Sequence, residues 1–522
     1  MKNKLTYISG VIAMCLLPGL LFSQHSSHKK HYTFEKIETR TPWLVSGNGA
    51  GLVYNKAQNF ATLAGYFSNE SGDYRNFNTP ESYSNFGIVT RSYNKVGKVF
   101  FYGSFNYDYG INQNMTWNGT VYPNATLNPI VDSIPGKVLR ESYILNGKVG
   151  YELNDLFAIG AAFDYNTSTM AKRTDGRNAN TLSMMNVSPG ISFRSGAISL
   201  GMNLFYKRDA EKVEYSFIGD ETGKKIYYME GLFFFTETGL ASTTILDRIY
   251  HKDIFGGSFQ AQYRTGNLCI FNEFSVDLGH ENDYDGDSYS KRYAYTDILK
   301  YKYDGRFQYK GNGADHILSL SFLSDENASY YVVNSFEQIP EELNNYRYFE
   351  YGKVLRYMTN YQKYGAEYKT FIRDGEWKCS WILAAGVNRQ IVEKDYRLYP
   401  AQYQQEITVD NAYLRVNKDF EIGDNSLFNL DLNGSYSTGK GDALDVKNPI
   451  TVGSLRQNTN LLYTDFNYNT AEIISAGIGA RYTRIMDSQK GRALYVGAAY
   501  KHYDAGDLGT RGVISLSLGM NF

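Results

Sequence analysis

The chain has 522 residues, and its 53 basic and 54 acidic side chains leave a formal net charge of −1. Without a basic excess to neutralise phosphates, we expect no nucleic-acid partner. Tyr and Phe are frequent, at 47 and 30 residues, and there are 49 Gly but only 10 Pro. Aromatic residues favour strands and glycine suits tight turns and crowded strands, so this composition is typical of an all-β protein. Cys269 and Cys379 are the only cysteines after residue 23, too few for a disulfide framework.

Residues 1–23 have the pattern of a secretory signal peptide. Two lysines supply a positive start, residues 8–22 are mostly apolar, and Ser23 is a small residue suited to cleavage. A lipoprotein anchored at Cys15 is the alternative, although Met14 is larger than the residue usually found before such a cysteine. No apolar run of about 18 residues follows the signal, so a membrane protein of this sequence has to be a β-barrel.

Residues 24–57 are predicted to form an N-terminal tail and then a hatch or lead-in before the first strand. The start of this stretch, 24–32, is polar and contains three His. We expect a solvated tail there, and binding of Cu, Ni or Zn by the imidazoles is the alternative. The following stretch, Thr41–Tyr54, is rich in Gly and does not alternate cleanly between apolar and polar residues.

Within Thr41–Tyr54, five residues form a short segment that is similar to one found in a known class of barrels. The segment consists of Asn48, Gly49, Ala50, Gly51 and Leu52. It is similar to the Asn-Pro-Ala-Gly-Leu segment near the start of the fatty-acid-transporter class, with Gly49 in place of Pro. The resemblance implies a segment that folds inside the barrel as a hatch. The residues alone leave open a periplasmic lead-in to the first strand.

From about Asn59 onward, apolar and polar residues alternate with the period of two that is typical of strands. The strand-like runs are 59–68, 83–93, 98–111, 140–153, 156–167, 181–194, 197–217, 243–264, 268–280, 289–309, 315–333, 347–373, 376–394, 406–420, 427–438, 456–486, 491–503 and 511–522. They number 18 if 456–486 is one strand, and a break at 469–471 would make 19. Because a single-chain bacterial barrel needs an even count, we predict one long strand there. The predicted fold is a transmembrane antiparallel β-barrel of about 18 strands, within a range of 14–18, over residues 58–522.

Short and long connections alternate along the predicted barrel. Short turns, for example 154–155 and 195–196, are expected in the periplasm. The long connections are expected outside the cell, at 112–139, 218–242, 334–346 and 439–455. The runs 289–309 and 347–373 exceed the roughly 10 residues that a membrane requires, so we expect them to project from the outer surface.

The chain ends in a strand with one apolar face. Ile514, Leu516, Leu518, Met520 and Phe522 alternate with small or polar residues. This ending resembles the C-terminal signal of bacterial outer-membrane barrels, which the barrel-assembly machinery reads as the last strand. Its apolar face is then expected to meet outer-membrane lipid and lipopolysaccharide. The alternative is an edge strand of a soluble sheet, which would be an aggregation hazard.

Alternation also predicts which charged side chains face the lumen. The candidates are Lys207, Glu273, Asp277, Lys300, Lys302, Asp304, Arg306, Arg415, Asp431, Arg481 and Lys501. Both signs of charge are present. These residues either line a wet channel with a mild preference for anions or pair with each other and fill the lumen.

One acidic stretch is a candidate metal site. Asp283, Asp285 and Asp287 stand at alternate positions around Gly286, in a predicted extracellular loop. Carboxylates spaced in this way can bind Ca²⁺, although the position of the Gly departs from an EF-hand. A solvated loop is the alternative, and we predict no other cofactor.

Enzyme activity is not expected from this sequence. An outer-membrane hydrolase would need a histidine beside a nucleophile or an acid. His280 lies near Ser275 and Asp283 in the sequence, and His502 is followed by Asp504 and Asp507, but neither group stands in a catalytic motif.

The pattern as a whole resembles outer-membrane barrels of the Bacteroidota. Gln24 after the cleavage site and the stretch Gly97–Gly110 carry this similarity, which points to an uncharacterised barrel family of that phylum. The resemblance implies a setting beside TonB-dependent receptors and brings no catalytic motif. We predict an integral outer-membrane barrel for solute passage or capture, as a channel or as an accessory to TonB-dependent uptake. A structural or surface-interaction barrel with a closed lumen is the alternative, and a hydrolase is least favoured.

Overall fold

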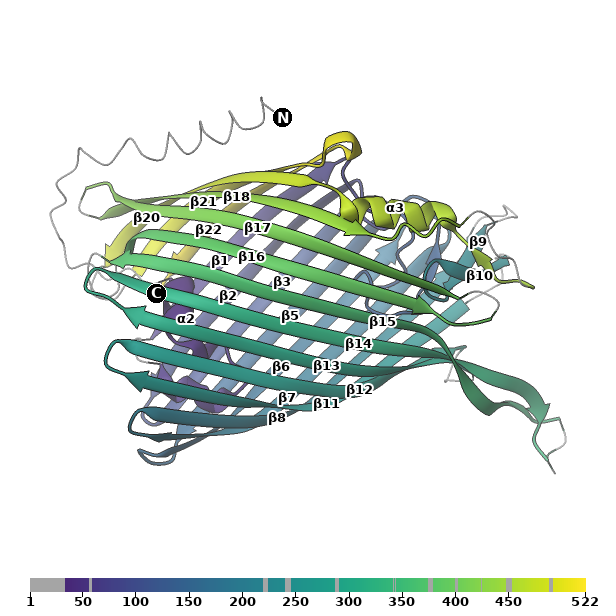
Figure 1. The fold of residues 1–522 in the computed structure, drawn as a ribbon, viewed down its shortest axis with the longest axis horizontal. Helices are drawn as coiled ribbons and strands as arrows, with labels where there is room; N and C mark the ends of the chain where they lie inside the picture. Colours follow the sequence, from purple (N-terminus) through teal and green to yellow (C-terminus); the bar gives the residue numbers. More distant parts are fainter. Residues whose placement is uncertain are drawn as a thin grey trace.

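The computed structural model describes residues 33–55, 59–218, 224–239, 246–286, 291–340, 342, 344–373, 379–399, 402–423, 425–446, 453–487 and 492–522. Within these ranges, eighteen strands pair antiparallel in one sheet, and β1 pairs with both β2 and β22, which closes the sheet into a barrel (Figure 1). The predicted all-β fold with 18 strands is confirmed. The predicted signal peptide and the His-containing tail lie outside the described residues.

The barrel strands follow each other around the wall in chain order. They are β1 (Phe60–Gly72), β2 (Ser82–Val96), β3 (Val99–Met115), β5 (Gly136–Glu152), β6 (Phe157–Lys172), β7 (Arg177–Ser195), β8 (Ile198–Ser216), β11 (Leu246–Thr265), β12 (Leu268–Asp285), β13 (Lys291–Lys310), β14 (Ala314–Gln338), β15 (Tyr346–Arg373), β16 (Cys379–Tyr396), β17 (Tyr403–Glu421), β18 (Ser426–Gly441), β20 (Ile473–Asp487), β21 (Arg492–Asp504) and β22 (Thr510–Asn521).

The remaining elements lie at the two ends of the barrel. They are α2 (Phe34–Arg40), η1 (Pro42–Leu44), η2 (Gly49–Tyr54), β4 (Ile130–Asp132), β9 (Lys225–Met229), β10 (Phe234–Gly239), β19 (Arg456–Gln457), α3 (Thr459–Thr470) and η4 (Gly506–Leu508). Strands β4, β9, β10 and β19 form a second, small sheet. Among the described helices, none has the length and apolar character that crossing a membrane requires.

The prediction of one long strand over 456–486 is wrong. Helix α3 occupies the first part of this run, and the side chain of Asn458 caps it by accepting a hydrogen bond of 3.2 Å from the backbone N of Leu461. Strand β20 begins only at Ile473. The run 456–486 therefore contributes a single strand, β20, to the barrel, and the number of barrel strands stays even.

The two ends of the barrel differ. Short turns join the strands at one end, which we call the short-turn end, and the longer connections gather at the opposite, long-loop end. Helix α2 lies within the barrel at the short-turn end, whereas β9, β10 and α3 lie at the long-loop end (Figure 1). There β14 and β15 continue as a two-stranded hairpin beyond their other neighbours, and this hairpin projects from the rim. Of the two runs expected to project, 347–373 does so, with β14 as its partner, whereas β13 stays paired with β12 to its end.

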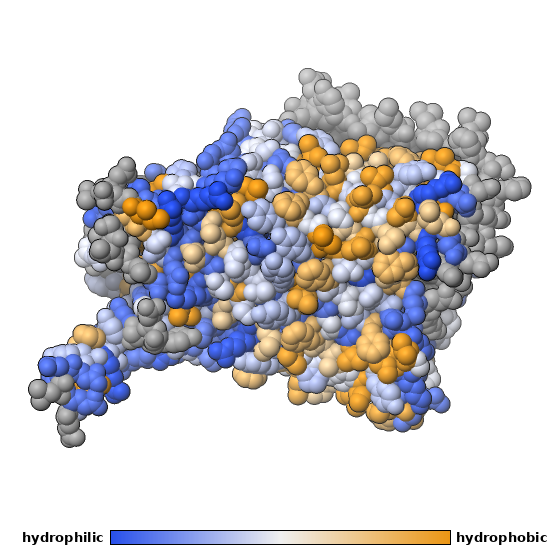
Figure 2. All heavy atoms as spheres, turned by 180° about the vertical axis from the view of Figure 1, so that it is seen from behind, coloured by the Kyte–Doolittle hydropathy of each residue, from blue (hydrophilic) through white to orange (hydrophobic). Residues whose placement is uncertain are grey.

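The outer wall carries an apolar band. Leu204, Phe255 and Leu518 point outward and are 58, 62 and 67% exposed. Figure 2 shows hydrophobic residues gathered over the part of the wall nearer the short-turn end, while hydrophilic residues dominate toward the long-loop end. In β22, the whole predicted apolar face, from Ile514 to Met520, is exposed on the outer surface, and Phe522 follows it. The pairing between β22 and β1 places this face next to that of Leu63 and Phe67.

A substitution in the last strand tests this assignment of faces. Leu516→Arg puts a charge on the outward face near the middle of the apolar band and should lower the free energy of unfolding by about 2–4 kcal/mol. The measurement is urea unfolding of protein folded in phospholipid vesicles. Ser515→Arg, on the inward face of the same strand, is the matched control and should cost clearly less. Equal losses for the two variants would contradict the assignment.

Candidate functional site

The strand register places the predicted lumen-lining side chains on the inner face of the wall. Among them are four ion pairs, namely Lys207–Asp277 at 2.6 Å, Lys300–Asp325 at 2.8 Å, Lys302–Asp304 at 2.7 Å and Arg415–Asp431 at 2.7 Å. Arg481 and Lys501 lie over the rings of Tyr495 and Tyr503, at 3.5 and 4.6 Å from the ring centroids. Lys302 keeps 58% of its side chain exposed although it is ion-paired. The inner face therefore combines paired charges with solvent-accessible space beside β13.

Residues 33–55, here called the inner segment, fold inside the barrel at the short-turn end. Thr33 caps α2, and its side chain accepts a hydrogen bond from the backbone N of Lys36. The side chain of Asn48 caps η2 in the same way, with Ala50 as the donor at 3.0 Å. Phe34, Ile37 and Leu52 are buried against Phe60, Tyr93 and Phe100 of the first barrel strands. The predicted hatch residues Asn48–Leu52 thus lie against the inner wall.

Charged side chains attach the inner segment to strands on several sides of the barrel. Lys36 pairs with Asp419 of β17 at 3.1 Å, Arg40 with Asp315 of β14 at 2.9 Å, and Glu35 with Arg415 of β17 at 2.8 Å. Glu38 pairs with Arg91 of β2, and its carbonyl oxygen accepts a hydrogen bond of 3.2 Å from Arg306. Glu273 accepts hydrogen bonds from Ser46 and from the backbone N of Gly47, at 3.1 and 3.3 Å. These contacts involve four of the predicted lumen residues, namely Glu273, Arg306, Arg415 and, through Arg415, Asp431.

Glycines on four neighbouring strands allow the inner segment to lie directly against the wall. They are Gly150 of β5, Gly160 of β6, Gly190 of β7 and Gly201 of β8. A Cβ atom on Gly160 would lie 2.3 Å from the backbone N of Ala50. A Cβ atom on Gly150 would lie 2.9 Å from the carbonyl oxygen of Gly49, with the next two contacts also in the inner segment. Larger residues at these positions would displace the segment.

Asn48 contacts two barrel strands at a gap in their pairing. The pairs between β7 and β8 stop at Val187↔Tyr206 and resume at Gly190↔Asn203, because Pro189 has no N–H to donate. Beside this gap, the side-chain amide of Asn48 donates hydrogen bonds to the carbonyl oxygens of Ile191 and Met202, at 3.0 and 3.3 Å. It also donates to Gln260 of β11 at 3.0 Å.

At the long-loop end, residues 116–135 and 224–239 fold back into the lumen, and we call them the first and second mouth segments. Strands β4 and β9 pair between them. Ile130 and Ile226 are fully buried against Val213, Tyr215 and Tyr250 of the wall. Phe234 of the second segment is fully buried in a further cluster with Tyr357, Tyr396 and Leu462. The mouth is therefore packed with apolar side chains from both mouth segments and from α3.

Buried polar residues fasten the mouth segments to the wall. Arg248 is fully buried and pairs with Asp285 at 2.6 Å. It also donates a hydrogen bond of 2.9 Å to the carbonyl oxygen of Asn128. Arg356 is also fully buried and pairs with Glu230 at 3.1 Å. It donates a hydrogen bond of 2.6 Å to the side-chain oxygen of Asn128.

The base of the first mouth segment has its own ion pair. Asp132 in β4 pairs with Lys172 of β6, and both side chains are almost completely buried. Burial raises the pKa of the Asp132 carboxyl, and the ammonium group of Lys172 opposes that rise.

The candidate calcium ligands are placed differently from the prediction. Asp283 and Asp285 belong to strand β12 and not to a loop, while Asp287 lies outside the described residues. Asp285 is bound by Arg248, and Asp283 accepts a hydrogen bond of 2.8 Å from Asn128. In the part of the chain that the structure describes, no group of three or more His, Cys, Asp or Glu side chains is arranged to hold a metal ion.

The structure does not bring His280 together with the candidate partners that the sequence offered for it, although the register pairs His280 with Asp253 and Asp297 of the neighbouring strands. His280 stacks on Tyr295, with 5.7 Å between the ring centroids. Ser275 and Asp283 have odd positions in β12, as does inward-facing Asp277, so they point to the face opposite His280. The ring of His502 contacts the hydroxyl of Tyr500 at 3.3 Å.

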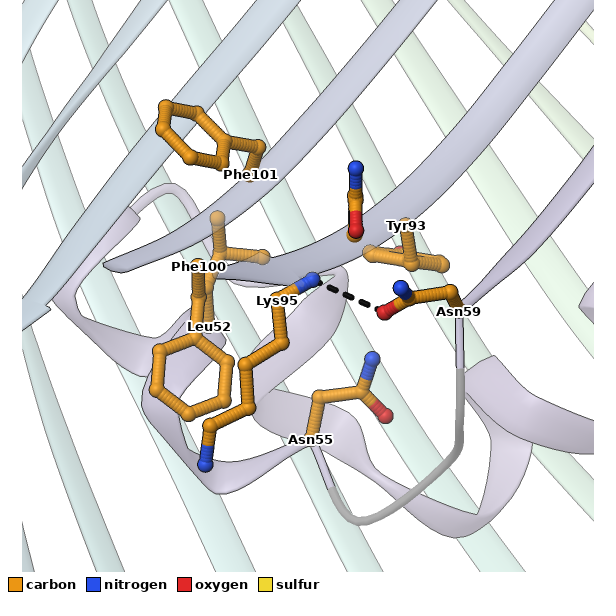
Figure 3. Close-up of a pocket in the computed structure, with 8 residues that line it drawn as sticks. Leu52, Asn55, Asn59, Tyr93, Lys95, Phe100 and Phe101 are labelled. Carbon is orange, nitrogen blue, oxygen red and sulfur yellow. Dashed lines mark hydrogen bonds between the residues drawn. The ribbon is translucent and has the colours of Figure 1, made fainter. Parts of the chain in front are cut away.

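A small pocket lies where the inner segment meets the turn between β2 and β3 (Figure 3). Its volume is about 240 Å³, part of it open to solvent, and it is lined by Leu52, Asn55, Asn59, Tyr93, Asn94, Lys95, Phe100 and Phe101. The side chain of Asn59 accepts a hydrogen bond of 2.9 Å from the backbone N of Lys95, whose ammonium group lies 4.4 Å from the centroid of the Phe100 ring. The pocket therefore belongs to the root of the inner segment.

Sequence reasoning missed the residues that fasten the mouth. Glu230 and Asn128 lie in long connections, where no periodicity assigns a direction. Arg356 and Tyr293 are the extra residues of two β-bulges, at which the pairing passes from Tyr357 to Leu355 and from Ala294 to Arg292. Strict alternation fails at a bulge. The sequence shows the tyrosine-rich run around Arg356, but only the strand register shows that Arg356 points inward.

Comparison with known proteins gives similarity of fold. No curated protein matches the chain. Among solved structures, the ferric preacinetobactin receptor BauA of Acinetobacter baumannii is 11% identical, with a TM-score of 0.41 over 89% of this chain and 80% of the receptor. The outer membrane transporter YddB of Escherichia coli is 10% identical, with a TM-score of 0.39 over 90% of this chain and 81% of the transporter. A FadL homologue of Pseudomonas aeruginosa is 12% identical, with a TM-score of 0.30 over 91% of this chain and 92% of the homologue.

A family model agrees with the extent of the barrel. The model matches residues 49–522, from the η2 turn of the inner segment to the last residue of the chain. The protein therefore belongs to the family of unknown function DUF6850.

Proposed function

We propose that this protein spans the outer membrane and passes a hydrophilic solute through its lumen, with the inner segment acting as a hatch. The short-turn end then faces the periplasm and the long-loop end faces the outside. The apolar band of Figure 2 has the position expected for contact with lipid. The structure described above is the closed state, with the hatch at one end and the mouth segments at the other.

The observation that carries this proposal is how the inner segment is attached. Its ion pairs range from the partly exposed Glu35–Arg415, whose side chains are 34 and 31% exposed, to the largely buried Lys36–Asp419, at 12% or less. A partly exposed ion pair contributes only about 0–1 kcal/mol, so several of them give a seat that is specific and still reversible. Between Gly49 and Val53, the backbone of the segment also rests on glycines of the wall. The apolar side chains of the segment pack against β1, β2, β3 and β12, whereas its contacts with β14 and β17 are ion pairs, which can separate without exposing apolar surface.

The inner face indicates the class of solute. Where it is free of the hatch and the mouth segments, it presents charges of both signs, for example Lys302 and Asp304 at 58 and 38% exposure. The inner face also carries amide and hydroxyl groups, for example those of Asn411 and Tyr413 on β17. Such a wall favours a hydrated, polar solute over a lipid.

A structural barrel with a permanently closed lumen is the second candidate. The apolar clusters of the mouth favour it, because Phe234, Ile130 and Ile226 are as fully buried as core residues. The resemblance to Bacteroidota barrels favours a narrower form of the first candidate, in which the barrel serves beside a TonB-dependent receptor. Calcium binding near Asp283 and Asp285 stays a prediction.

One variant tests whether the inner segment can leave its seat. Gly150→Val adds a side chain where the first three contacts are all with residues 49–53, so the segment should no longer fit. Trypsin should then cleave after Lys36 or Arg40, which are shielded in the closed state. The measurement is mass spectrometry of fragments from protein folded in detergent micelles.

The matched control is Gly147→Val on the same strand, where the nearest atom to an added Cβ is 3.9 Å away. This variant should resist trypsin like the unmodified protein. Equal protection of the Gly150→Val variant, with the barrel folded, would show that the segment is fixed in place.

A second experiment opens both closures and measures conductance in planar bilayers. Gly150→Val unseats the hatch, and Phe234→Asp places a carboxylate in the apolar cluster of the mouth. The combined variant should form a stable channel because a buried unpaired charge is costly and expels the second mouth segment. The unmodified protein should be silent.

The control for this experiment combines Gly147→Val with Phe336→Asp, a residue that is 58% exposed on the projecting hairpin. It should be silent. If the combined Gly150→Val and Phe234→Asp protein is folded and also silent, the proposal of solute passage is wrong and the structural barrel is favoured.

A further inference from the structure

We propose that Glu230, bound by Tyr293 and Arg356, is a latch that holds the two mouth segments shut as a single gate. This inference rests on the proposed function, because a gate has a meaning only if a solute passes. It concerns the long-loop end, whereas the hatch closes the short-turn end. Glu230 lies in the second mouth segment, directly after β9.

Two β-bulges aim side chains at Glu230. In β13 the pairing with β12 skips Tyr293, and in β15 the pairing with β14 skips Arg356. The hydroxyl of Tyr293 donates a hydrogen bond of 3.0 Å to one carboxylate oxygen of Glu230, and Arg356 donates one of 3.1 Å to the other. Bulges redirect side chains and are frequent next to functional sites. Two bulges on separate strands that converge on one carboxylate indicate a built site.

Arg356 also joins the second mouth segment to the first. One amino group of its guanidinium pairs with Glu230, and the other donates 2.6 Å to the side-chain oxygen of Asn128 in the first segment. Asn128 in turn donates a hydrogen bond of 2.8 Å to Asp283 and accepts one of 3.0 Å from Ser329. Loss of the guanidinium therefore frees one contact on each segment at the same time, which makes the two segments a single cooperative unit.

The latch is buried, but its hydrogen bonding is incomplete. Arg356 is fully buried and Glu230 is 7% exposed. Among the described residues, the Nε atom of Arg356, the hydroxyl of Tyr396 and one carboxylate oxygen of Asp283 have no hydrogen-bond partner. Polar groups left unsatisfied in the interior raise the free energy of the closed state. This property suits an element that has to open more than it suits a permanent core.

The experiment uses the full chain with the hatch unseated by Gly150→Val, so that only the mouth separates the two solutions. Arg356→Met removes the guanidinium and keeps most of its volume. Lys172→Met is the matched control, because it breaks a comparably buried ion pair that holds the first mouth segment alone. The readout is open probability in planar bilayers, and heat-modifiability on gels reports whether each barrel is folded.

We expect Gly150→Val with Arg356→Met to raise the open probability on the order of a hundred-fold over Gly150→Val alone, as for loss of one partner of a buried charge pair. Gly150→Val with Lys172→Met should stay near the level of Gly150→Val alone. Should the Arg356 variant fail to fold, Glu230→Gln and Tyr293→Phe remove the charge and one hydrogen bond of the latch, and each should give a smaller rise.

Three results would overturn the latch. Gly150→Val alone conducts fully, the Lys172 variant opens as much as the Arg356 variant, or all latch variants are silent while Gly150→Val with Phe234→Asp conducts. In each of these cases solute passage still stands. If Gly150→Val with Phe234→Asp is itself silent, the proposed function fails, and the latch fails with it.

Discussion

The structure depends on one constraint, which is that backbone N–H and C=O groups facing lipid must be paired within the protein. The pairing between β22 and β1 satisfies it by removing the last two free edges of the sheet. Closure then separates two environments, because successive side chains point alternately to lipid and to the lumen. Residues such as Leu516 take the outer face, and their neighbours, such as Ser515 and Ser517, take the inner one. The polar lumen follows from the closed wall.

The two closures are built with different physical chemistry. The inner segment combines a buried apolar cluster with several ion pairs, and of these the partly exposed Glu35–Arg415 is weak and depends on ionic strength. The mouth is attached by fully buried arginines and apolar clusters, in which loss of one partner leaves a charge without solvation. The attachment at the short-turn end therefore depends in part on ionic strength, whereas the attachment at the long-loop end depends on buried charge pairs.

Most of the barrel could be predicted from the sequence because alternation is a local signal repeated many times. The prediction failed at 456–470, where the spacing of Leu461 from Tyr463 and of Phe466 from Tyr468 suggests a strand. The cap at Asn458 and burial of Leu461 and Leu462 in the mouth select a helix instead. The candidate site was less predictable. Charges on regular strands, such as Lys207 and Asp277, were identified by parity, but the register shifts at Tyr293 and Arg356 and the inward folding of the mouth segments result from contacts between distant residues.

The gap beside Pro189 has a thermodynamic consequence. At this point the pairing of β7 with β8 is interrupted, and Asn48 of the inner segment binds one carbonyl oxygen of each strand next to the gap. Seating of the inner segment in the lumen and pairing of β7 with β8 therefore both depend on the Asn48 side chain, so the two equilibria are linked. The free energy that seats the inner segment is also part of the barrel's resistance to unfolding. Release of the inner segment is then a partial unfolding of the protein, and its free energy is one part of the stability of the whole fold.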